Sequence, residues 1–69
     1  MNEANKAAIT KLKSLIDTSS DEQMKLSAIA ALGEAGGAIA VTKLKALINT
    51  SKNKNIQLQA IAALGRAGR

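Results

Sequence analysis

The sequence has 69 residues and contains no Cys, His, Pro, Trp, Tyr or Phe. Ten Lys and Arg residues against five Asp and Glu residues give a formal net charge of +5. Without Cys or His the chain offers no disulfide, thiolate nucleophile, histidine base or structural zinc site. Without aromatic rings it cannot stack nucleobases as single-strand binders do. We therefore expect a protein that is not an enzyme and that uses no cofactor or metal.

Apolar residues recur at spacings of three and four, which is typical of amphipathic helices. This pattern predicts helices, and together with the internal repeat described below it predicts one all-α domain over 1–69, a short αα-solenoid of four antiparallel helices. The predicted helices cover residues 2–17, 21–35, 38–49 and 53–67. No apolar run approaches the length of about 20 residues that spans a bilayer, and the first residues do not resemble a signal peptide. The sequence therefore favours a cytoplasmic location.

The ends of the helix predicted over 21–35 have local signals. Ser19 and Glu22 have the spacing of a capping box, with Ser19 as the N-cap. Gly33 and Gly36 are expected to end this helix, because glycine suits the left-handed C-cap. Lys52 and Lys54 place positive charge at the start of the last helix, where it opposes the helix dipole. We therefore expect the last helix to begin raggedly.

The chain repeats itself with a period of 32 residues. Residues 8–36 recur as 40–68, with 18 identities in 29 aligned positions. A fixed period in the range of 20–50 residues is typical of solenoid proteins. Glu34 becomes Arg66 in the second repeat, which indicates that both side chains lie at the surface.

This pattern resembles the HEAT-like repeats of the phycobilin-lyase type. The residues that carry the resemblance are Asp21-Glu22, Ala28-Ile29-x-Ala31-Leu32-Gly33-x-x-Gly36 and Ala40-Val41-x-x-Leu44-x-x-Leu47-Ile48. The resemblance implies that the helices over 21–35 and 38–49 form one complete repeat. It also implies that the helices over 2–17 and 38–49 line a concave surface, which we expect to bind a protein or peptide partner. The residues expected on this surface are Lys6, Thr10, Lys13, Thr42, Lys45 and Asn49.

Two alternative functions remain open at this point. Lys13 and Lys45, expected side by side, could form a basic groove for the nucleic-acid backbone, although binding by so few lysines would be weak and salt-dependent. The resemblance also makes a non-catalytic component of a chromophore-lyase-type complex conceivable. Binding at a membrane surface is not expected, because no Trp or Phe is present to anchor in the interface.

The last predicted helix is too apolar to present a solvent face, as a terminal repeat normally does. Either the chain is a fragment of a longer array or another copy covers this helix. We expect self-association, most simply as a two-fold homodimer. The residues expected to mediate it are Ile56, Leu58, Ile61 and Leu64.

Overall fold

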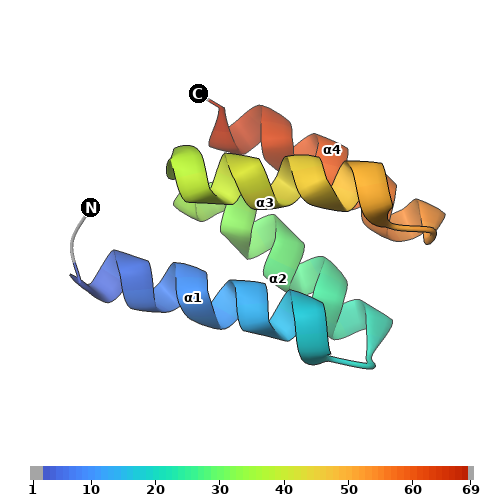
Figure 1. Cartoon of the computed structure of the whole chain (residues 1–69), viewed down its shortest axis with the longest axis horizontal. Coiled ribbons are helices and arrows are strands. Elements are labelled where there is room, and N and C mark those ends of the chain that lie inside the picture. Colours follow the sequence, from blue (N-terminus) through green and yellow to red (C-terminus); the bar gives the residue numbers. More distant parts are fainter. Residues whose placement is uncertain (1–2, 69) are drawn as a thin grey trace.

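A computed structural model of the chain describes residues 3–68, which form four helices and confirm the all-α prediction. The helices are α1 (Glu3–Thr18), α2 (Glu22–Ala35), α3 (Gly37–Thr50) and α4 (Lys54–Ala67) (Figure 1). The predicted ends at Ala35 and Ala67 match the structure, and the other described ends differ from the predicted bounds by one residue. The predicted start at Asn2 lies outside the described residues.

The helices form two hairpins that pack side by side. The first hairpin is α1 against α2, the second is α3 against α4, and α2 packs closely on α4 to join them. Helices α1 and α3 run in the same direction and make little contact with each other (Figure 1). The resemblance implied a repeat unit made of α2 and α3, but these two helices make only a small contact. Helix α2 therefore packs mainly on α1 and α4, and α3 packs mainly on α4, whereas the expected repeat unit would have α2 and α3 packed on each other.

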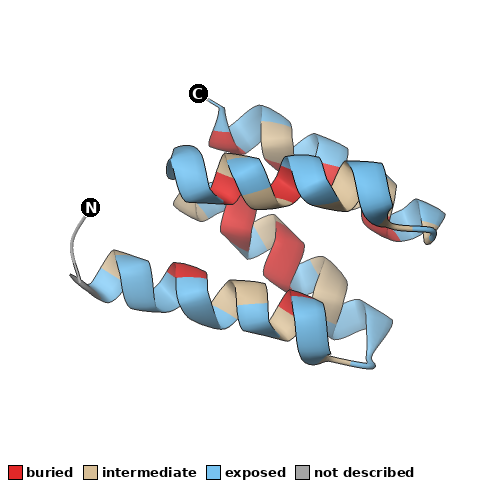
Figure 2. Cartoon of the chain, in the orientation of Figure 1, coloured by how far each residue is buried: buried red, intermediate tan, exposed pale blue. Residues whose placement is uncertain are grey.

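The core is aliphatic and draws its buried side chains from all of α1, α2, α3 and α4 (Figure 2). Ile29, Leu32 and Leu44 are fully buried, and no polar side chain is buried among the described residues. Three of the four buried residues of α4 are alanines, and one of them, Ala63, lies against Gly33 of α2. Small residues let two helix backbones approach closely, so this contact is formed by closely fitting backbones and not by large side chains. The buried alanines of the whole core are Ala28, Ala40, Ala60, Ala63 and Ala67.

Gly33 lies inside α2 and does not end it, contrary to the sequence prediction. A Cβ atom at position 33 would lie 2.8 Å from both the Cβ and the carbonyl oxygen of Ala63. Gly33 is therefore required for the close approach of α4. The helix ends at Gly36, whose φ of +69° is a conformation that favours glycine. The Gly36 N–H donates to the carbonyl oxygen of Leu32 at 3.1 Å.

The two turns that link the helices within each hairpin have the same geometry. Asp21, and not Ser19, caps α2: its carboxylate accepts from the N–H groups of Gln23 and Met24 at 2.8 and 3.3 Å. Asn53 occupies the equivalent position and accepts from the Ile56 N–H at 3.2 Å. Helix α4 therefore begins directly after its N-cap, and the predicted ragged start is not observed.

Glu22 does not reach back to close a capping box. Its carboxylate instead accepts from the side-chain amide of Asn53, and from that of Asn55 at 3.4 Å, so it connects the two hairpins. The reason is positional, because the turn before α4 lies beside the start of α2 once the hairpins pack.

The N-cap of α2 gives a first testable prediction. Replacing Asp21 with alanine removes the acceptor of two backbone N–H groups, and we expect a loss of about 0.5–2 kcal/mol in the free energy of unfolding. The matched control is Asp21→Asn, because Asn53 already caps α4 in the same geometry. Urea unfolding in dilute solution measures both. An equal loss for both variants would show that charge, and not the hydrogen bonds, stabilises this end of α2.

Candidate functional site

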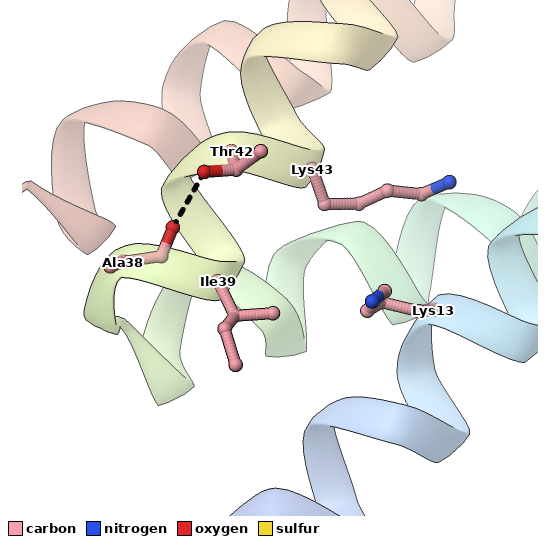
Figure 3. Close-up of a pocket in the computed structure, with 5 residues that line it drawn as sticks. All are labelled: Lys13, Ala38, Ile39, Thr42 and Lys43. Atoms are coloured by element: carbon pink, nitrogen blue, oxygen red, sulfur yellow. Dashed lines mark hydrogen bonds between the residues drawn. The ribbon is translucent and has the colours of Figure 1, made fainter.

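The first candidate surface is a hollow of about 240 Å³ between α1 and α3, here called the lysine hollow. Figure 3 shows Lys13 from α1 opposite Ile39 and Lys43 from α3. It is lined by Lys13, Ala38, Ile39, Thr42 and Lys43. The structure therefore brings together two of the predicted partner-binding residues, Lys13 and Thr42.

The polar groups of the lysine hollow are largely engaged within the chain. Lys43 Nζ lies 2.5 Å from Asp17 Oδ1, an ion pair that joins the end of α1 to α3. The Thr42 hydroxyl donates to the carbonyl oxygen of Ala38 at 3.0 Å (Figure 3). Lys13 has no ion-pair partner among the described residues. The hollow thus presents one unneutralised ammonium group beside an exposed isoleucine.

The other predicted partner-binding residues do not line this hollow. Lys6, Thr10, Lys45 and Asn49 are exposed on α1 and α3. Lys43, and not Lys45, shares the hollow with Lys13. The lysine hollow therefore does not hold the pair Lys13 and Lys45 that the resemblance implied, and α1 and α3 pack mainly on α2 and α4 with little contact between them.

The second candidate surface is the outer face of α4, defined by Leu58, Ile61 and Gly65. Leu58 is 56% exposed and Ile61 is 53% exposed. The structure corrects the other two predicted self-association residues. Ile56 belongs to the core, at 8% exposure, and Leu64 packs partly buried against that core. Only Leu58 and Ile61 of the predicted set are therefore strongly exposed.

The internal repeat shows how far the exposed side chains on the outer face of α4 would be buried if another hairpin packed against that face. Leu58 and Ile61 are equivalent to Leu26 and Ile29 in the first repeat. Ile29 is fully buried, and Leu26 packs against the core. The same side chains at the same repeat positions are thus buried (Ile29) or partly buried (Leu26) on α2 and exposed on α4, because α2 has a neighbouring hairpin on that side.

A third surface was not anticipated from the sequence. It is a hollow of about 450 Å³ on the first hairpin, here called the α1–α2 groove. The side chains that line it are Leu12, Leu15, Asp21, Gln23, Met24, Ser27, Ala28 and Ala31. Met24 is 54% exposed, whereas its equivalent Ile56 is in the core. The residues that line this groove recur in the second hairpin with the 32-residue period, but only the tertiary structure shows which of the two repeats leaves them uncovered.

The described residues contain no group of three or more acidic, His or Cys side chains that could hold a metal ion. None of their helices combines the length and the apolar character needed to cross a membrane. Comparison with protein-family models, with curated proteins and with solved structures finds no match to this chain. The chemistry of the exposed surfaces therefore carries the functional argument.

Proposed function

We propose that this chain is a non-enzymatic HEAT-like repeat module that binds protein, and that its first partner is another copy of itself. Both candidate apolar surfaces, the outer face of α4 and the α1–α2 groove, suit contact with a protein. Leu58 and Ile61 are exposed on α4 and Met24 is exposed in the groove. The groove lining also includes the polar side chains of Asp21, Gln23 and Ser27. Exposed apolar patches rimmed by polar residues are typical of protein interaction sites.

One observation carries the proposal. Leu58 and Ile61 are exposed on α4, whereas their repeat equivalents on α2 are partly buried (Leu26) and fully buried (Ile29). Covering side chains of this size stabilises an assembly, since full burial of a leucine or isoleucine contributes about 1.5–3 kcal/mol. A 69-residue chain also gains from association, because small domains bury only about 60% of the surface of the unfolded chain.

Binding of the nucleic-acid backbone has less support. Of the two lysines in the lysine hollow, Lys43 is already paired with Asp17. Lys45 lies outside that hollow. Each phosphate contact requires an available cation, and affinity from so few contacts would fall steeply with salt. A role in a chromophore-lyase-type complex rests on the sequence resemblance alone.

The experiment that tests self-association is light scattering after gel filtration over a range of protein concentrations. We expect the solution mass to exceed that of the 7.1 kDa monomer and to rise with concentration. Replacing both Leu58 and Ile61 with glutamate should return the chain to the monomer, because two charges would be buried without partners. The circular dichroism spectrum of this double variant should still be that of a helical protein, because both side chains are exposed in the single chain.

The matched control places two glutamates on exposed positions whose repeat equivalents are also exposed. Ser14 and Ala46 meet this condition, since they are equivalent to each other and both are exposed. The variant with Ser14→Glu and Ala46→Glu should associate as the parent chain does. A parent chain that stays a folded monomer at every concentration would refute the proposed function.

A further inference from the structure

We propose that copies of this chain stack head to tail, so that the outer face of α4 on one copy fills the α1–α2 groove of the next. This inference rests on the proposed self-association and specifies its geometry. The contact between the two hairpins within one chain is the template. Because the hairpins are sequence repeats, each surface that forms this contact has a sequence equivalent on the other hairpin. Those equivalents include the exposed Leu58 and Ile61 on α4 and the exposed Met24 and Ala31 in the α1–α2 groove.

The apolar surfaces match in this register. On α2, Leu26, Ile29 and Gly33 are spaced as one helix face, and Gly33 places that face against α4. The equivalent face of α4 is its outer face. The residues of the second hairpin that are equivalent to the lining of the α1–α2 groove include Leu44, Ala60 and Ala63, which are all fully buried. A groove of the same kind is therefore filled inside the chain and open on the first hairpin.

The closest approach between the hairpins can also repeat between copies. Gly33 leaves room for Ala63 inside the chain, and their repeat equivalents are Gly65 and Ala31. A Cβ atom at Gly65 would have no neighbour within 4 Å in the single chain, and Ala31 is exposed in the α1–α2 groove. Head-to-tail stacking would place Gly65 of one copy against Ala31 of the next copy.

The charges at the edges of the two surfaces are complementary in the same register. Arg66 Nε lies 3.7 Å from Glu34 Oε1, and these residues are repeat equivalents. In a stack, Arg66 would also face Glu34 of the next copy, so the two signs would alternate along the assembly. The contact of Glu22 with Asn53 would repeat as Lys54 facing Asp21 of the next copy.

A two-fold dimer through α4 would lack this complementarity. In an isologous contact the same patch meets itself, so Lys54 and Arg66 of the two copies would share one interface without their acidic counterparts on α2. A head-to-tail contact is heterologous and leaves a free face on each terminal copy, so it extends beyond two chains unless the rotation closes a ring. The structure thus favours stacks over the two-fold homodimer that the sequence suggested.

Site-directed cross-linking tests this geometry, because the chain has no native cysteine. Two single variants, Glu34→Cys and Arg66→Cys, are mixed and treated with a short thiol-specific bismaleimide. In a stack, the new thiol at position 66 of one chain faces the new thiol at position 34 of the next. Cross-linked dimers should therefore form in the mixture and not in either variant alone. The chain that carries both substitutions, in dilute solution, should form the intrachain cross-link and so shows that the reagent spans this pair.

The other outcomes overturn the inference in distinguishable ways. If the variants associate by light scattering but Arg66→Cys cross-links with itself, the assembly is two-fold through α4, and the proposed function survives without the stack. If the variants associate and the mixture gives no cross-link while the intrachain control does, the stack is wrong and the proposed self-association survives through another interface. If the parent chain and both variants are monomeric at every concentration, the proposed function and the stack both fail.

Discussion

Replacing Ile29 with alanine is expected to lower the free energy of unfolding by about 2–5 kcal/mol, because the change leaves a cavity in a closely packed core. Ile29 is fully buried where α2 meets the second hairpin. A loss of this size is comparable with the whole stability of a small domain, which is about 5–15 kcal/mol. Urea unfolding followed by circular dichroism, at a concentration where the chain is monomeric, measures the effect.

Ile61 provides the matched control, because the same residue type occupies the equivalent repeat position on α4. Ile61 is about half exposed in the single chain, and surface substitutions usually change stability by about 0.5 kcal/mol or less. Equal losses for Ile29→Ala and Ile61→Ala would contradict the burial that the structure assigns to these two positions.

The second large effect is expected for Gly33→Ala. Alanine normally stabilises a helix interior by about 0.8–1 kcal/mol relative to glycine. At position 33 the new Cβ would lie 2.9 Å or less from three atoms of Ala63, two of which are backbone atoms. Helix α4 must therefore move away, and overpacking of this kind costs about 1–3 kcal/mol. Thermal or urea unfolding should show a clear loss of stability.

Gly65→Ala is the control and should have the opposite sign in the monomer. A Cβ atom at position 65 meets nothing within 4 Å, so the substitution should stabilise α4 by about 0.5–1 kcal/mol. In a head-to-tail stack the same Cβ atom would meet Ala31 of the next copy, so association should weaken while the monomer becomes more stable. A loss of monomer stability at position 65 would show that this face of α4 is already covered within the chain.

The 32-residue period and the helical spacing of aliphatic residues were sufficient to predict an all-α chain and the approximate range of each helix. Both features are local or depend only on comparison of the sequence with itself. The capping residues were predicted less well. Ser19, Asp21 and Glu22 can all serve at a helix start, and the turn geometry selected Asp21 as the cap. Glu22 does not cap α2, because the packing of the hairpins brings the side-chain amide of Asn53 beside its carboxylate, which accepts a hydrogen bond from that amide.

The role of Gly33 shows a similar limit. Glycine near the end of a predicted helix favours a C-cap, yet here it lies within the helix and makes room for Ala63 on α4. The sequence contains the same glycine and alanine in both repeats, so nothing local distinguishes position 33 from position 65. Their difference arises only because α2 has α4 as a neighbour.

For the candidate surfaces too, the sequence determined one part and the tertiary structure the other. Composition by itself determined that the chain offers aliphatic and cationic side chains without aromatic rings, thiols or imidazoles, and the repeat determined that these side chains occur in equivalent pairs. Tertiary structure decided which member of each pair is covered. Ile29 is buried and Ile61 is exposed, although both are isoleucines in nearly identical local sequence. Burial depends on which helix lies alongside, and that neighbour is set by the packing of the two hairpins.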